Sequence, residues 1–142
     1  MDQVNSSLAS VTERQSASLA PLGVGADSFD DYTRHIKVAD THFRSGRFDE
    51  AAASYRAALV LQPQGELSDE AHYRLGLHAL EDEDKDAAAD HFRKVVIGTP
   101  GSRYFARAGT ALADLLVQRR EFASARRLLY TVIGARNRLD AA

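Results

Sequence analysis

Five histidines are the residues of this chain best suited to metal or acid–base chemistry. His35 and His72 stand one repeat apart, at a position that packs between paired helices. The others, His42, His78 and His91, show neither a His-Glu-x-x-His motif nor another zinc-ligand spacing. There is no cysteine, which excludes thiolate ligands and a cysteine nucleophile. We therefore expect interhelical or surface histidines and predict no metal.

Charged clusters suggest two other kinds of site. The acidic run at 81–86 lacks the central glycine and the final glutamate of an EF-hand loop, so a solvated turn is the better interpretation. The basic pairs at 119–120 and 126–127 lack regularly interleaved aromatic residues, and the net charge of the chain is −2. We predict no nucleic-acid partner.

Motifs for covalent or phosphate chemistry are also missing from the sequence. It has no Gly-rich phosphate loop and no Gly-x-Ser-x-Gly nucleophile elbow. A dispersed Ser–His–Asp triad leaves no spacing signature, and nothing points to one. We predict that the protein is not an enzyme and needs no cofactor.

The composition is that of a soluble globular chain, with 142 residues, 44% hydrophobic and 27% charged. No apolar run approaches the roughly 20 residues that a membrane span requires. The first residues lack the basic and apolar regions of a signal peptide. We expect no membrane insertion and a cytoplasmic location, or a periplasmic one if a signal peptide has been removed.

The elements that position these residues follow from an internal period of 37 residues. Within 32–44, 69–81 and 106–118, apolar residues recur at three- and four-residue steps, which predicts amphipathic helices. Each second helix carries the same pattern: Phe48, Ala51, Tyr55, Ala58 and Pro63, then Lys85, Ala88, Phe92, Val95 and Pro100, then Phe122, Ala125, Leu129, Val132 and Asn137. Each unit is therefore a helix pair.

Turn and cap residues mark the ends of these helices. We expect turns at 45–47, 82–84 and 119–121, and prolines at 63 and 100 that end the second helices. Ser68 and Ser102 are candidate N-caps for the next units. Residues 1–28 form a flexible or weakly helical segment, and the first repeat helix follows a cap at Asp27 or Ser28. The domain then covers 29–142, with repeats of about 32–68, 69–105 and 106–142.

These residues resemble the tetratricopeptide repeat, in which Leu-Gly in the first helix precedes Ala, an aromatic residue, Ala and Pro. Leu75-Gly76 and the series Ala51, Tyr55, Ala58 and Pro63 match that pattern. The resemblance implies an all-α fold, a right-handed α-solenoid of three antiparallel helix pairs. The longer spacing before each new helix is similar to that in bacterial envelope proteins of the Tol–Pal-associated and outer-membrane-assembly lipoprotein kinds. The third copy departs most, with Gly109, Thr110 and Asn137.

The resemblance also implies a concave groove lined by the first helix of each pair. Its exposed positions would be Thr33, Ile36, Asp40, Phe43, Arg44, Glu70, Tyr73, Arg74, Leu77, Leu80, Arg107, Thr110, Asp114 and Val117. Phe43, Tyr73, Leu77 and Leu80 would form an apolar floor, with Arg74 and Arg107 at its edges. That mixture suits a partner peptide or helix with apolar anchors and an acidic group. The alternative, that some of these residues pack between repeats, remains open.

A carboxylate clamp of the chaperone-binding kind is not expected, because Ile36, Asp40 and Ala111 replace the required Lys, Asn and basic residue. The sequence therefore predicts a non-catalytic protein–protein interaction scaffold. The alternative is self-assembly, in which repeats stack end to end into homo-oligomers. It rests on the uncapped third repeat and on a charge of −4 over residues 1–31 against +4 over 106–142.

Overall fold

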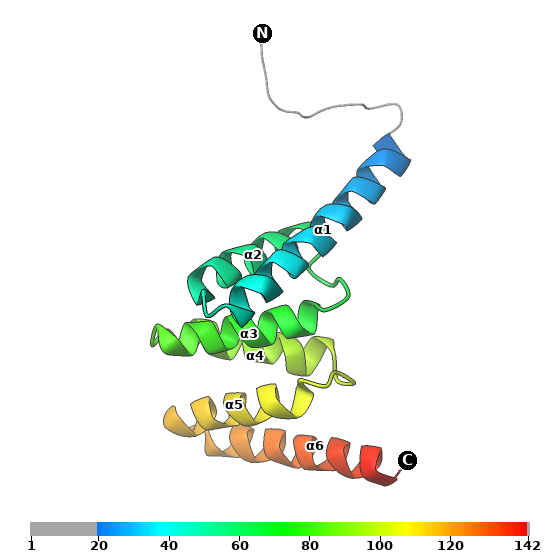
Figure 1. Cartoon of the computed structure of the whole chain (residues 1–142). Helices are drawn as coiled ribbons and strands as arrows, with labels where there is room; N and C mark the ends of the chain where they lie inside the picture. The colour runs from blue at the N-terminus through cyan, green and yellow to red at the C-terminus, as the bar shows by residue number, and fades with distance from the viewer. Residues whose placement is uncertain (1–19, 142) are drawn as a thin grey trace.

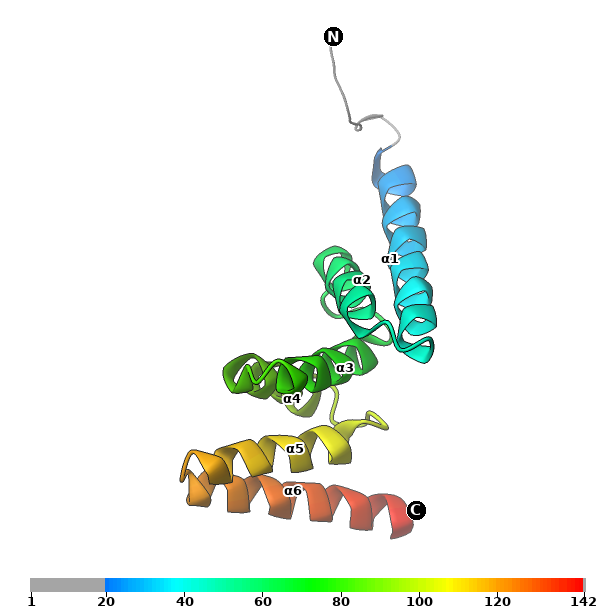
Figure 2. The same ribbon diagram turned by 60° about the vertical axis from the view of Figure 1, so that its left-hand side comes forward.

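Residues 20–141, which the computed structural model describes, form six helices and no strand (Figure 1). The helices are α1 (Ala20–Arg44), α2 (Phe48–Leu61), α3 (Ser68–Glu81), α4 (Lys85–Gly98), α5 (Phe105–Gln118) and α6 (Phe122–Ala141). Each helix packs on the next in chain order. Figures 1 and 2 show three antiparallel pairs whose axes turn relative to one another along the stack. The predicted all-α solenoid of helix pairs is confirmed.

Small residues let the two helices of each pair approach closely. Ala51, Ala88 and Ala125, one per repeat, are all buried. Gly76 of α3 faces the buried ring of Phe92 on α4, and a Cβ atom at Gly76 would lie 2.5 Å from Phe92 Cε1. A Cβ atom at Gly109 of α5 would likewise lie 2.5 Å from Val132 Cγ2 of α6. The glycine that seemed a departure in the third repeat is therefore a packing residue.

The turn between the two helices of a pair has the same backbone structure in all three repeats. Gly46, Glu83 and Arg120 occupy equivalent positions and all have left-handed backbones, with φ of 77°, 60° and 63°. In each turn the next N–H bonds back to a helix carbonyl, as from Arg47 to His42 at 2.9 Å. This pattern is a Schellman motif, which satisfies carbonyls at the helix end. The predicted turns are confirmed, although only the first uses glycine.

Proline sets the length of the second helices. Helices α2 and α4 end at Leu61 and Gly98, two residues before Pro63 and Pro100, as expected from the loss of an N–H donor at proline. Helix α6 has Asn137 at the equivalent position and continues to Ala141. Helix α6 is longer than α2 and α4 because no proline ends it at this position.

Three predicted helix starts are wrong. Helix α1 begins at Ala20, not after Asp27 or Ser28, and Pro21 lies in its first turn, where a missing N–H costs nothing. Ser68 is the first residue of α3, and Leu67 with φ 72° is its N-cap. Ser102 lies before the N-cap of α5, and its hydroxyl donates to Asp69 of α3. Residues 1–19 of the predicted N-terminal segment lie outside the described residues.

The core forms two clusters along the stack. One joins Tyr32, Ile36 and Tyr55 to Leu75 of the second repeat, and the other runs from Ala79 through Phe92 to Leu112 and its neighbours. No helix in the described part of the chain is long and apolar enough to cross a membrane.

The Gly76–Phe92 contact gives a stability prediction. Replacing Gly76 with Ala forces the new methyl group into the Phe92 ring, which has no room to move because it is fully buried. We expect the free energy of unfolding to fall by about 1–3 kcal/mol, measured by urea denaturation. Gly98→Ala, whose new Cβ would contact nothing within 4 Å, is the matched control. Equal stabilities of the two variants would contradict this account of the packing.

Candidate functional site

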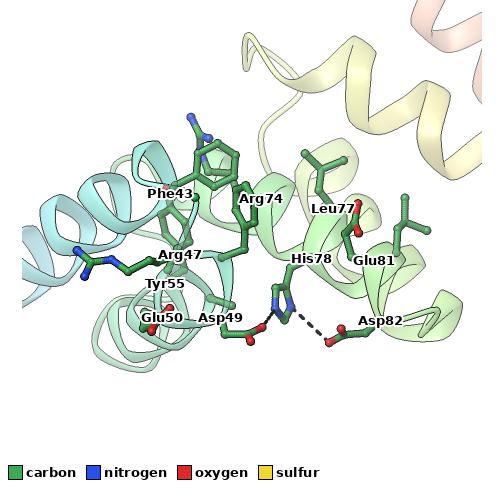
Figure 3. Close-up of a pocket in the computed structure, with 15 residues that line it drawn as sticks. Phe43, Arg47, Asp49, Glu50, Tyr55, Arg74, Leu77, His78, Glu81 and Asp82 are labelled. Atoms are coloured by element: carbon green, nitrogen blue, oxygen red, sulfur yellow. Dashed lines mark hydrogen bonds and ion pairs between the residues drawn. The ribbon is translucent and has the colours of Figure 1, made fainter.

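A groove of about 740 Å³ opens between the first and second repeats (Figure 3). Its walls come from the end of α1, the start of α2 and the C-terminal half of α3, with the turns that follow α1 and α3. Its apolar surface consists of Phe43, Phe48, Leu77 and Leu80. We call it the interrepeat groove. It lies where α2 meets α3, a contact less extensive than that between α4 and α5.

Two aromatic rings and an arginine build one side of the groove. The Phe43 and Phe48 rings meet edge to face, with centroids 5.2 Å apart. The Arg74 guanidinium lies over the Phe43 ring, 3.9 Å from its centroid, in a cation–π contact. The same guanidinium pairs with Glu70 at 2.8 Å. Arg74 is therefore a neutralised part of the wall and not a free cation.

The base of the groove is fixed by a buried hydrogen bond. The Tyr55 hydroxyl donates to the Asp40 carboxylate at 2.5 Å. Burial, followed by this bond to Asp40, raises the pKa of Tyr55 far above its usual value. Tyr55 thus stays protonated, and Asp40 is held beneath it, away from a ligand.

Carboxylates surround the apolar surface. Asp49 and Glu50 come from the start of α2, and Glu81 and Asp82 from the end of α3. Against these four acids the lining has two arginines, Arg47 and the paired Arg74. The groove therefore combines an apolar floor with an acidic rim.

His78 lies between two of these acids (Figure 3). Its Nε2 is 2.8 Å from Asp49 and its Nδ1 is 3.7 Å from Asp82. The ring is mostly buried, while both carboxylates reach solvent. His78 thus connects the first repeat to the second across the groove.

The order of helices and turns can be compared with known families. Residues 37–103 match the family model of the tetratricopeptide repeat. This segment consists of tetratricopeptide repeats. The match runs from α1 to the loop before α5, and the equivalent turns and helix starts extend the same repeat through α6. This fold is commonly a protein–protein interaction module, and its members are typically non-catalytic scaffolds.

Solved structures confirm the fold of this protein, and 19 chains match it. One is the crystal structure of MamA, with a TM-score of 0.65 and 16% sequence identity. The match covers 78% of this chain and 61% of the MamA chain, so this chain spans less than two thirds of that protein's length. At that identity the similarity concerns the fold alone. No curated protein matches by sequence.

Four of the fourteen positions that we predicted to line a binding groove lie together in the interrepeat groove. They are Phe43, Arg74, Leu77 and Leu80. The predicted apolar floor therefore exists over the first two repeats, without Tyr73. Whether these residues bind a partner remains a prediction.

The other predicted residues lie elsewhere. Ile36 was wrong as an exposed position, because only 3% of it is exposed and it packs in the core with Tyr32 and Ala39. Tyr73 stacks on Tyr104 with ring centroids 5.1 Å apart, so it packs between the second and third repeats. Asp40 is bonded to Tyr55. The remaining seven do not line this groove: Thr33, Arg44, Glu70, Arg107, Thr110, Asp114 and Val117.

The sequence analysis missed the start of α2 and the end of α3. Phe48, Asp49, His78 and Asp82 all line the groove. A signal was available, because Phe48 follows a glycine turn at a position where the second repeat has Lys85. Phe48 remains half exposed even though its ring packs against Phe43.

A second histidine contact joins α3 to α4. The Nδ1 atoms of His72 and His91 are 3.1 Å apart. Burial, with the nearby His91, lowers the pKa of His72 from 6.5 to about 4, and burial also lowers the pKa of His91. Both rings are therefore neutral near pH 7, and one nitrogen donates to the other. Within residues 20–141, no three His, Cys, Asp or Glu side chains lie close enough to hold a metal.

This histidine pair predicts a pH-dependent stability. The unfolded chain protonates His72 near pH 6.5, whereas the folded protein resists protonation until about pH 4. Acid therefore favours the unfolded state across that interval. We expect the melting temperature to fall less between about pH 7 and about pH 4.5 in the double variant His72→Gln/His91→Gln than in the native protein. An identical fall in both proteins would show that the pair does not carry the effect.

Proposed function

We propose that this protein is a non-catalytic scaffold whose interrepeat groove binds apolar side chains of a partner peptide or helix. The observation that carries the proposal is the apolar surface of Phe43, Phe48, Leu77 and Leu80 in a groove of about 740 Å³. Half of the Phe48 side chain is exposed. Burying such a surface against a partner is favourable, and aromatic side chains dominate the energy of many protein interfaces.

The equivalent position between the second and third repeats supports this choice of groove. The 37-residue register places Lys85 where the first groove has Phe48, and Asp114 where it has Leu77. Asp114 is exposed and accepts a hydrogen bond from Gln118. An apolar side chain of a partner that bound between the second and third repeats would therefore lie next to Lys85 and Asp114. Two of the four apolar positions of the first groove are therefore charged in the second, while the other two remain apolar as Leu80 and Val117.

The electrostatics argue against the acidic partner that we expected from Arg74 and Arg107. Arg74 is paired with Glu70, and Arg107 lies on α5 outside the groove. The rim carries Asp49, Glu50, Glu81 and Asp82, and an acidic ligand would be repelled there.

Selection of short random peptides displayed on phage tests the proposal. We expect the native protein to select peptides with apolar residues, and the double variant Phe48→Ala/Leu77→Ala to bind them at least about tenfold more weakly, because it removes apolar contact area. Fluorescence anisotropy measures the affinities, and circular dichroism confirms that the variant is folded. Unchanged affinity in the folded variant would disprove the groove as the binding site.

Phe122→Ala is the matched control. Phe122 occupies the same register position in α6, is equally exposed, and lies outside the groove. We expect it to bind the peptides normally. Self-assembly is the second candidate function, favoured by the exposed side chains of Phe122, Tyr130 and Ile133 on α6. A solution mass above 15.5 kDa for the native protein that returns to the monomer value in Phe122→Ala would support that candidate instead.

A further inference from the structure

The junction between the second and third repeats contains an ion pair that the interrepeat groove lacks. Between the second and third repeats, the Arg119 guanidinium on the turn after α5 pairs with Asp86 at the start of α4. The 37-residue register places Asp82 at the position of Arg119, and Asp49 at that of Asp86. Where one junction has an acid and a base, the other therefore has two acids.

His78 does not resolve this difference. It stands where the second junction has the buried Leu115. Its Nε2 is 2.8 Å from Asp49, within hydrogen-bond distance, whereas its Nδ1 is 3.7 Å from Asp82. Nδ1 is buried and has no hydrogen-bond partner. His78 therefore makes no hydrogen bond to Asp82.

Both carboxylates are open to a ligand from solvent. The Asp49 side chain is 91% exposed and the Asp82 side chain 65% exposed. They lie on either side of His78 (Figure 3), in a groove that is also lined by the apolar side chains of Phe48 and Leu77. A cationic group that enters here would contact both acids, while the rest of its chain covers the apolar floor.

We propose that the partner of this groove carries an arginine that binds between Asp49 and Asp82, as Arg119 pairs with Asp86 in the next junction, next to an apolar residue that contacts Leu77. The proposal rests on the proposed function and names its ligand class. A planar guanidinium with several donors suits two carboxylates better than an ammonium group does.

The test compares a groove-binding peptide from the phage selection with its copy in which citrulline replaces arginine. Citrulline keeps the shape of the side chain and removes its charge. We expect the native protein to prefer the arginine peptide at least about tenfold, since hydrogen bonds between charged groups are strong. In Asp82→Arg, which installs the arginine of the second junction in the first, the preference should disappear, as it should in Asp49→Asn/Asp82→Asn.

Glu121→Arg makes the same charge change in the turn before α6, outside the groove. This variant should keep the preference for the arginine peptide over the citrulline peptide. Selected peptides that depend on Phe48 and Leu77 but contain no basic residue would overturn this inference and leave the proposed function intact. A preference that persists in Asp82→Arg would overturn it as well. Selected peptides that do not depend on Phe48 and Leu77 would overturn both proposals.

A second copy of the chain could also occupy the groove. A doubled solution mass that Asp82→Arg alone abolishes would show this and would contradict a peptide partner.

Discussion

The close contact between the two helices of each pair is the constraint on which the rest of the structure depends. Gly76 lets the Phe92 ring lie against the α3 backbone, and Gly109 does the same for Val132. Because the paired helices are so close, large side chains on their outer ends have no place inside the pair. Phe43, Phe48 and Leu77 lie at the junction between the first two repeats and give the interrepeat groove its apolar surface.

Charge then distinguishes the two junctions between repeats. Arg119 and Asp86 join one of them, whereas Asp49 and Asp82 leave the other acidic. The turn after the first helix of the pair is thus basic at one junction, where it forms an ion pair, and acidic at the other. The proposed function assigns binding to the acidic junction.

The sequence predicts what depends on local chain chemistry. The 37-residue period located six helices, and Pro63 and Pro100 predicted where α2 and α4 end, because proline acts on its own helix. The start of α1 was missed, because Pro21 is as compatible with the first turn of a helix as with a loop. Left-handed Glu83 and Arg120 were not foreseen either, since their residue types do not favour that backbone.

The groove was harder to predict than the helices, because it depends on how repeats stack. Tyr73 and Leu77 lie on one helix face, yet Tyr73 stacks on Tyr104 and Leu77 lines the groove. Ile36 has the apolar character of a groove residue but is held in the core. Arg74 looks like a free cation until Glu70 and Phe43 are placed beside it. Sequence gives the face of a helix, and the neighbouring repeat decides what that face contacts.

The most direct test of the central claim is an NMR titration of the labelled protein with a selected peptide. The account predicts that the largest changes in chemical shift fall on the methyl groups of Leu77 and Leu80 and on the rings of Phe43 and His78. Changes concentrated instead on Tyr130 and Ile133 of α6, or on the exposed Val60 and Ile97 of α2 and α4, would contradict it.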